Sequence, residues 1–488
     1  MLNQSPPKMI GDILAEQGII TRSQLEEALQ KQQRSQEPLG RVLVGLGYVT
    51  EHQLVEALAA QYQFVERDIR QTVDLPNHNL IRESSGEEAS VIGLVQHILQ
   101  KAVRLGASDI HFEPQETGFR VRLRMDGILR PLLNLPVNMQ AAVVSRIKIM
   151  SDLDIAEKRL PQDGRLPLST GSQKYDLRVS TMPTAYGEKV VIRLLDTGAV
   201  RQYRLEQLDF SPHNLARLKH CLRAAYGMIL ITGPTGSGKT TTLYTVLNEL
   251  NNEQRNLSTI EDPIEYRLEG VNQTQVNTKA GMSFAVGLRA LLRQDPDIIM
   301  VGEIRDKETA EIAVKAAGTG HLVLSTLHTN DAVGAVDRFI HMGIEPFQVA
   351  SSVLGVVAQR LVRRLCPYCK QPYRVVADSL EGYFAGVLPG QEAVYYRPVG
   401  CRRCYHSGYR GRLAIHEILL LSRRLRTLLL NRATADELLA AAGQEGMQTL
   451  QTDGLTKAKQ GLTSLPEVMR ATYFQAESFF DTTVLQKM

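Results

Sequence analysis

The feature that most constrains this chain is a glycine-rich octapeptide at residues 233–240. An apolar run at 228–231 precedes it, and a segment with helical periodicity follows it at 241–250. The octapeptide fits the pattern G-x4-G-K-[ST], in which backbone N–H groups surround phosphates, the lysine reaches the β and γ oxygens and the hydroxyl binds Mg²⁺. A helix N-terminus that follows a strand also favours bound anions, because of its unpaired N–H groups and its dipole. The sequence therefore predicts a nucleotide-binding loop, with Mg²⁺ on Thr240 and these contact residues: Gly233, Pro234, Thr235, Gly236, Ser237, Gly238, Lys239, Thr240 and Thr241.

Polar side chains follow the other apolar runs of this region. Residues 200–362 alternate predicted strands and helices, as in a doubly wound sheet, which binds ligands at the carboxyl ends of its strands. Glu261 and Asp262 follow the run 257–260. Glu303 follows the run 298–301, and His328 follows the run 322–326. We therefore expect these side chains at the same edge as the phosphate-binding loop.

This set of residues suits hydrolysis of a nucleoside triphosphate, which needs a carboxylate to orient water and cations to neutralise the γ-phosphoryl group. We predict that Glu303 activates the water. Glu261 and Asp262 are predicted to act through Mg²⁺ or water, and His328 to sense the γ-phosphate. Two alternatives stay open: the acidic pair forms a turn before Pro263, and the histidines pack through hydrogen bonds.

Four of the five cysteines form two C-x2-C pairs, Cys366/Cys369 and Cys401/Cys404. This double spacing is typical of a tetrahedral structural zinc site that closes a segment too small for its own core. The first pair alone also resembles a glutaredoxin-type redox pair, in which a second pair has no place. The remaining Cys221 is expected to be a buried core residue.

Residues 91–199 have a mixed α and β pattern. Helices are predicted at 91–105 and 141–149, and strands at 118–124, 175–181 and 189–194, with a turn at Asp126-Gly127. Arg178 and Arg193 lie on the last two strands. An extended arginine there either lies in solvent or reaches a phosphate on a neighbouring domain.

The N-terminal region, 1–66, contains an internal repeat. Residues 10–14 return as 39–43, and each copy continues with a Thr-x-x-Gln capping box, at Thr21 and at Thr50. Two such helix pairs predict a small helical module, followed by a polar linker at 67–90. The Cys segment spans 363–412. The tail, 413–488, is predicted to be helical, with helices at 435–439, 455–460 and 465–472.

The chain of 488 residues suits three or four domains, and its net charge of +4 is small for that length. Nucleic acid is therefore not expected as a partner. The first residues lack the pattern of a secretory signal, and no window has about 18 uninterrupted apolar residues. We expect a cytoplasmic protein that reaches a membrane only through partners.

The motifs together resemble the secretion ATPase superfamily, in its branch of type II secretion and type IV pilus assembly ATPases. The resemblance lies in S-D-I-H-F-E-P at 108–114, L-P-Q-D-G-R at 160–165, the string 281–297, G-E-I-R-D at 302–306 and the stretch 319–330. It implies a RecA-like P-loop core behind a PAS-like α+β domain, and a hexameric ring that acts on an inner-membrane platform protein and on the cytoplasmic domain of a membrane anchor. Its cofactors would be ATP, Mg²⁺ and Zn²⁺.

The resemblance also assigns residues. Residues 297–303 correspond to the Walker B motif, and 321–328 to the histidine box. The implied catalytic residues are Glu303, Lys239, Glu261, Asp262, Arg178, Arg193 and His328. Further nucleotide contacts are implied for Asp297, Arg289, Arg293 and His321.

The N-terminal repeat resembles a module that binds cyclic di-GMP in some of these ATPases. The basic residues expected before each Leu-Gly pair are absent, since Met9 and Pro38 occupy those positions. Docking onto a membrane partner is therefore the other interpretation of this module. The rival to a motor is a nucleotide-gated regulatory scaffold that responds to cyclic di-GMP.

Overall fold

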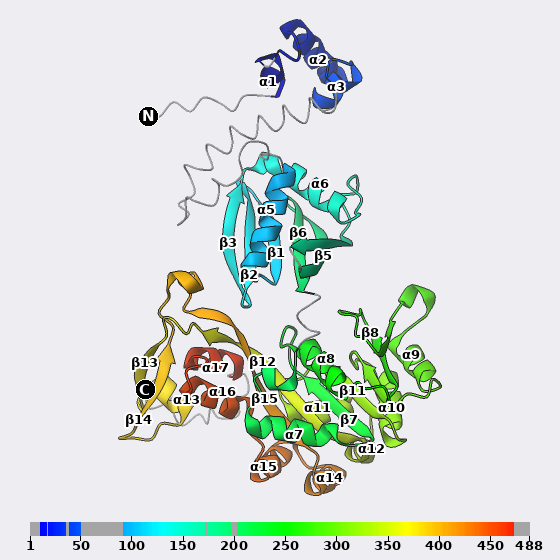
Figure 1. Cartoon of the computed structure of the whole chain (residues 1–488), viewed down its shortest axis with the longest axis vertical. Helices are drawn as coiled ribbons and strands as arrows, with labels where there is room; N and C mark the ends of the chain where they lie inside the picture. Colours follow the sequence, from blue (N-terminus) through cyan, green and yellow to red (C-terminus); the bar gives the residue numbers. More distant parts are fainter. Residues whose placement is uncertain are drawn as a thin grey trace. The chain divides into compact units, whose positions relative to one another are not determined.

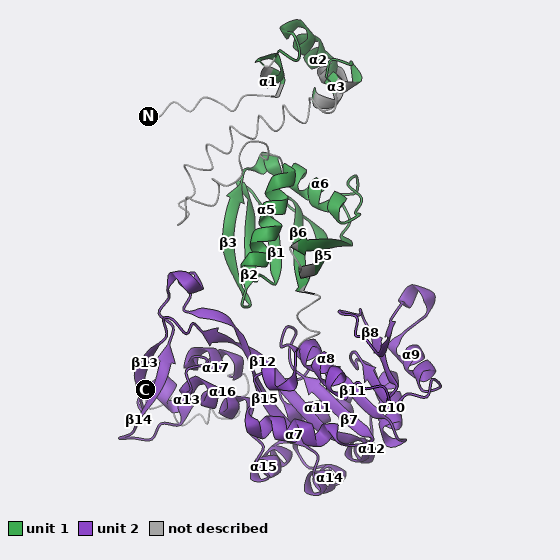
Figure 2. Ribbon diagram, in the orientation of Figure 1, with its two compact units in different colours: residues 1–195 green, residues 196–488 purple. Residues whose placement is uncertain are grey.

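The computed structural model describes residues 10–16, 18–35, 39–49, 91–170, 173–196 and 203–472. The chain divides into two compact units, Met1–Leu195 and Asp196–Met488 (Figure 2). Among the helices that the structure describes, none combines the length and the apolar character needed to span a bilayer.

Three short helices begin the described chain: α1 (Ile10–Glu16), α2 (Arg22–Ser35) and α3 (Leu39–Gly45). The predicted capping box precedes α2, where the Thr21 N–H donates to Gln24 Oε1 at 2.8 Å and the Gln24 N–H donates to Thr21 Oγ1 at 3.3 Å. Leu14, Ala28 and Leu43 form part of a small core. The second predicted box, at Thr50, lies outside the described residues, so the repeat module stays a prediction.

The rest of the first unit is a six-stranded sheet in the order β3-β2-β1-β6-β5-β4, with two helices packed on its apolar face (Figure 1). The predicted helices and strands occur here, together with β1, β3 and β4, which the sequence analysis did not identify. The elements are α5 (Val91–Arg104), α6 (Gln140–Met150), β1 (Asp109–Gln115), β2 (Gly118–Met125), β3 (Ile128–Leu135), β4 (Gln162–Thr170), β5 (Gln173–Thr184) and β6 (Gly187–Asp196).

The second unit contains a seven-stranded sheet in the order β15-β12-β7-β11-β10-β8-β9. Its strands pair in parallel except β15, which runs antiparallel to β12. The strands are β7 (Gly227–Thr232), β8 (Leu257–Glu261), β9 (Val271–Gln275), β10 (Ile298–Val301), β11 (Leu322–Leu327), β12 (Val353–Leu365) and β15 (Tyr409–Leu420). Because β15 follows the Cys segment, the sheet extends beyond the predicted core of 200–362, and the predicted tail begins with a strand instead of a helix.

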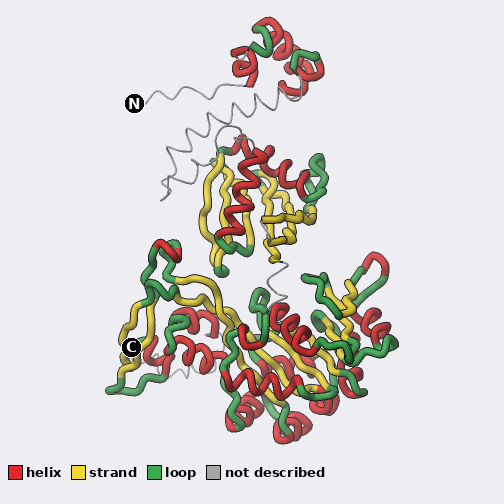
Figure 3. Tube along the Cα trace, in the orientation of Figure 1, coloured by secondary structure: helices red, strands yellow, loops and turns green. Residues whose placement is uncertain are grey.

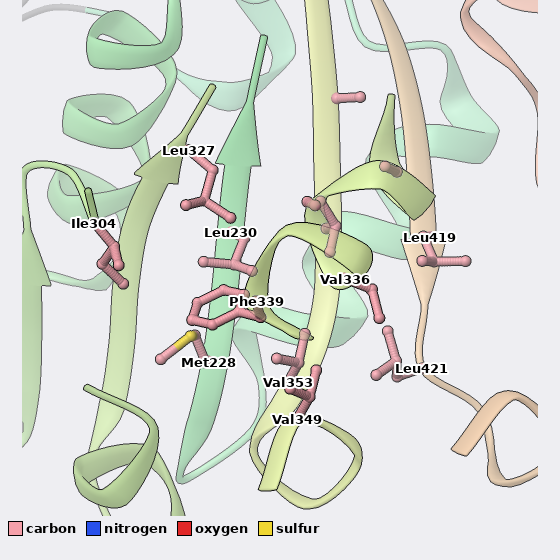
Figure 4. Close-up of a cluster of buried hydrophobic side chains, with 14 of the residues drawn as sticks. Met228, Leu230, Ile304, Leu327, Val336, Phe339, Val349, Val353, Leu419 and Leu421 are labelled. Carbon is pink, nitrogen blue, oxygen red and sulfur yellow. The ribbon is translucent and has the colours of Figure 1, made fainter. Parts of the chain in front are cut away.

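Helices cover both faces of this sheet (Figure 3). Side chains alternate along each strand, so Met228 and Leu230 of β7 pack on one face, with Phe339 of α11 (Figure 4), while Ile229 packs on the other. The helices are α7 (Pro212–Leu222), α8 (Lys239–Leu250), α9 (Phe284–Leu291), α10 (Lys307–Gly318), α11 (Ala332–His341), α12 (Pro346–Ser352), α14 (Arg423–Leu430) and α15 (Ala435–Gln444).

The Cys segment forms a small lobe between β12 and β15. Its hairpin packs on two C-terminal helices through Tyr395, Leu465 and Val468. The elements are β13 (Gln371–Val376), α13 (Leu380–Ala385), β14 (Glu392–Arg397), α16 (Leu450–Lys459) and α17 (Leu465–Thr472). All three helices predicted for the tail occur, as α15, α16 and α17, although α16 ends at Lys459, one residue before the predicted end.

Candidate active site

The phosphate-binding loop connects β7 to α8. Gly233 and Gly238 have φ angles of +147° and +88°, which L side chains rarely adopt. A Cβ atom at Gly233 would also overlap the backbone oxygen of Gln359 on β12. The Ser237 hydroxyl is buried and has no hydrogen-bond partner among the described residues, as expected of a group that completes its bonding with a ligand. The loop geometry therefore fits an anion cradle.

Lys239 lies at the first position of α8. Its ammonium donates to the carbonyl oxygens of Gly233 at 2.7 Å and Pro234 at 3.1 Å. Burial lowers the pKa of Lys239, and the negative charge of Glu303 opposes that shift. Thr240 is exposed and Thr241 is half-buried in the first turn of the same helix.

Glu303 follows β10 at the carboxyl edge of the sheet and lies within a group of charged side chains. Its Oε1 forms an ion pair with Arg305 Nη2 at 2.5 Å, and its Oε2 lies 3.6 Å from His328 Nε2. The charge of Asp262 also acts on Arg305 and raises the pKa of that guanidinium, although the ion pair with Glu303 contributes more. The structure thus brings Glu303, His328, Asp262 and Lys239 together at one edge.

His328 has its ring beside three charged groups. Burial lowers its pKa, the charges of Lys239 and Arg305 lower it further, and Glu303 opposes them. At neutral pH the imidazole is therefore uncharged, with one nitrogen that donates and one that accepts a hydrogen bond.

Hydroxyl groups fix the backbone next to His328. Thr232, the last residue of β7, accepts a hydrogen bond from the Thr329 N–H at 2.9 Å, and the two hydroxyls lie 2.7 Å apart. Sequence reasoning missed both threonines, because only the parallel pairing of β7 with β11 brings them together.

The carboxylate of Glu261 is occupied by protein donors. It accepts hydrogen bonds from Thr259 Oγ1 at 2.6 Å, from Gln273 Nε2 at 3.0 Å and from the Tyr244 hydroxyl. The side chain is buried, which raises its pKa. This geometry anchors β8 to β9 and α8, and among these bonds none involves the phosphate-binding loop.

Asp297 and His321 lie at the amino ends of β10 and β11, at the sheet edge opposite the phosphate-binding loop. Asp297 Oδ2 accepts from the Asn256 N–H at 2.7 Å, and His321 Nδ1 lies 3.1 Å from the Ala316 carbonyl oxygen. The prediction that these two side chains contact the nucleotide therefore disagrees with their positions. The sequence motifs include them because each one precedes a buried strand whose other end reaches the site.

Of the four arginines assigned by resemblance, Arg289 and Arg293 lie in the second unit, on α9 and just after it. Arg289 pairs with Glu308 at 2.7 Å, and Arg293 donates to the Arg289 carbonyl oxygen at 2.9 Å. Arg178 and Arg193 belong to the first unit, on β5 and β6, and Arg193 pairs with Asp109 at 3.1 Å.

The four paired cysteines converge on a potential metal site. Their sulfurs all lie within 4.8 Å of one another. Three of the separations are 3.9 Å for Cys366–Cys401, 3.8 Å for Cys369–Cys404 and 3.7 Å for Cys401–Cys404. A tetrahedral zinc site with Zn–S bonds of about 2.3 Å has sulfurs about 3.8 Å apart, so the donor set fits Zn²⁺. Cys221 is buried in the core, as predicted.

A mainly parallel sheet with a phosphate-binding loop after β7 and a carboxylate after β10, at the same edge, defines a P-loop nucleotide hydrolase. Residues 84–470 match the family model described as type II/IV secretion system protein. The chain belongs to this family and is an ATPase, as the sequence motifs indicated.

Individual relatives agree with this assignment. The chain is 52% identical over 386 residues to type II secretion system protein E of Pseudomonas aeruginosa, covering 79% of this chain and 76% of that protein. It is 51% identical over 391 residues to the type IV pilus assembly ATPase PilB of Myxococcus xanthus, covering 80% and 69%. A crystal structure of the pilus retraction motor PilT with bound ADP matches with a TM-score of 0.50 at 25% identity, covering 80% of this chain and 98% of that chain. Neither these names nor the described N-terminal residues support the cyclic di-GMP alternative.

Proposed function

We propose that this chain is the ATP-hydrolysing motor of a type II secretion system or a type IV pilus. The meeting of Lys239, Glu303 and His328 at the mouth of the phosphate-binding loop carries this proposal. The chain is 52% identical to a relative from type II secretion and 51% identical to a relative from type IV pilus assembly, so one ATPase cycle is proposed for either assembly. The protein works in the cytoplasm, at the inner-membrane face, and assembles into a hexameric ring.

In the proposed reaction each residue has one role. The loop N–H groups and Lys239 bind the phosphates, Thr240 holds Mg²⁺, and Glu303 orients the water and accepts its proton. Mg²⁺ held there would supply charge neutralisation to the phosphates. Neutral His328 donates a hydrogen bond to the γ-phosphate. Asp262 acts on this cluster through Arg305.

The arginines complete the site in the ring. Arg178 and Arg193 from the first unit, with Arg289 and Arg293 from the second, are proposed to approach a nucleotide and to couple hydrolysis to domain movement. Their guanidinium groups suit phosphate oxygens better than a lysine would, because they bind in a planar fork.

The remaining assignments concern structure and partners. The Cys lobe, at 363–412, is proposed to hold Zn²⁺ through Cys366, Cys369, Cys401 and Cys404. The N-terminal region, 1–66, is proposed to dock onto a membrane partner. Identification of the membrane protein that co-purifies with the full chain separates secretion from pilus assembly.

The hydrolysis step has a direct test. We expect Glu303→Gln to lower the rate of phosphate release from ATP by at least about a hundredfold and to retain ATP binding, because the amide cannot accept the proton. The matched control is Glu311→Gln on α10, whose carboxylate lies at the surface in an ion pair with Lys307 at 3.7 Å. Hydrolysis at the unchanged rate in Glu303→Gln would overturn the assignment of Glu303.

A further inference from the structure

The side chain of Gln359 connects β12 to the phosphate-binding loop. Its Nε2 donates to the Ser237 carbonyl oxygen at 2.8 Å, and its Oε1 accepts from Thr242 Oγ1 at 2.7 Å. Gln359 is 3% exposed and Thr242 is 1% exposed, so water does not compete for these bonds. One amide therefore ties the centre of the loop to the first turn of α8.

The backbone of β12 also lies against the loop. A Cβ atom at Gly233 would overlap the Gln359 carbonyl oxygen, and one at Gly238 would lie 2.7 Å from Gln359 Nε2. Two reasons therefore require glycine at both positions. The φ angles are positive, and Gln359 lies too close to leave room for a Cβ atom. The contact with Gln359 thus requires the glycines of the loop pattern, and the glycines allow Gln359 to approach the loop.

The bond to Ser237 fixes the direction of one peptide group. In a trans peptide the C=O and the following N–H point in opposite directions. When the Ser237 carbonyl points at Gln359, the Gly238 N–H points away from β12, into the cradle. A carbonyl turned the other way would repel a phosphate.

We propose that Gln359 is a positioning residue of the ATP site, which holds the Ser237–Gly238 peptide so that its N–H faces the bound phosphates. This inference rests on the proposed ATP site and adds a residue that none of the sequence motifs contains. The same cradle holds phosphates before and during hydrolysis, so its loss weakens binding of ATP and ADP alike.

The test compares two substitutions in the full chain. Gln359→Met keeps the length of the side chain and removes both hydrogen bonds. Gln359→Glu keeps the acceptor for Thr242 but places a carboxylate oxygen, which cannot donate, against the Ser237 carbonyl oxygen. We expect the dissociation constant for Mg-ADP, measured by titration calorimetry, to rise about tenfold in Gln359→Met and further in Gln359→Glu. The KM for ATP should rise by the same factor, with kcat changed less than about twofold.

Ser352→Ala is the matched control. Ser352 is 1% exposed and immediately precedes β12, and its hydroxyl donates within α12 to the Gln348 carbonyl oxygen at 2.7 Å. A purely structural loss reduces the number of folded molecules, which lowers kcat and leaves KM unchanged. Folded Gln359 variants with the dissociation constant of the unsubstituted protein, or with the pattern of Ser352→Ala, would overturn the proposal. Failure of the unsubstituted chain to bind Mg-ADP would instead overturn the ATP site itself.

Discussion

At the scale of single residues, the charge state of His328 decides how the catalytic cluster behaves. Burial, Lys239 and Arg305 together keep its pKa below the ordinary value for histidine. Protonation would place a positive charge 3.6 Å from Glu303 and would make that carboxylate a weaker base. Hydrolysis therefore needs the neutral imidazole.

This gives a prediction for the pH profile. As the pH falls below the lowered pKa, His328 gains a proton and kcat decreases, so the acid limb lies below about pH 6.5. His328→Gln should lower kcat throughout and remove that limb, because glutamine does not titrate. The measurement is kcat between pH 5 and 8, with exposed His341→Gln on α11 as the control. An unchanged acid limb in His328→Gln would assign it to another group.

Glu303 and His328 were predicted correctly as neighbours because each follows a predicted parallel strand. The carboxyl ends of parallel strands lie at the same edge of a sheet, so this inference requires only the sequence. Sequence reasoning missed Thr232 and Gln359 because their partners lie far along the chain, and nothing in their local pattern marks them. It misplaced Asp297 and His321, because a motif records the order of residues but not which end of a strand a side chain occupies.

At the scale of secondary-structure elements, Glu417 joins three of them. Its side chain on β15 is buried and accepts hydrogen bonds from the Ala332 N–H at 2.8 Å and the Leu450 N–H at 3.2 Å, at the N-termini of α11 and α16. Burial raises the pKa of Glu417 to about 7. Glu417 thus links α11, which follows His328 in the chain, to α16, which packs against the hairpin of the Cys lobe.

The raised pKa predicts how stability depends on pH. Between pH 4.5 and about 7 the folded protein holds a proton on Glu417 that the unfolded chain has released, so stability falls as pH rises through this window. The full effect is about 3 kcal/mol, at about 1.4 kcal/mol per pKa unit. Glu417→Gln should flatten this slope in calorimetric unfolding, whereas exposed Glu253→Gln should not. An equally steep slope in Glu417→Gln would contradict the prediction.

Most elements with clear periodicity were predicted, but one was overlooked. β1 alternates apolar residues with Asp109, His111 and Glu113, as β2 alternates them with arginines, and all three of these polar side chains are buried. Glu113 is compensated by Arg122 at 2.7 Å on β2, a contact that only strand pairing creates. The position of β15 in the main sheet was equally hidden, since its partner β12 precedes the Cys lobe.

At the scale of the whole molecule, the proposed metal site joins the chain just after β12 to the chain just before β15, within the second unit. The lobe has a small core, so metal binding should supply much of its folding free energy. We expect one zinc per chain by mass spectrometry, lost in Cys401→Ser, and a lower unfolding temperature for that variant. Cys221→Ala removes a buried thiol elsewhere and should keep the metal. Full zinc content in Cys401→Ser would contradict this assignment.

The antiparallel pairing of β12 with β15 has a consequence during synthesis. β12 leaves the ribosome well before β15. The edge of β12 that pairs with β15 therefore stays unpaired until the Cys lobe and β15 have been synthesised. An unpaired strand edge readily pairs with other chains. A protein truncated between residues 366 and 408 should therefore aggregate, and only translation past residue 420 closes the sheet that holds the nucleotide.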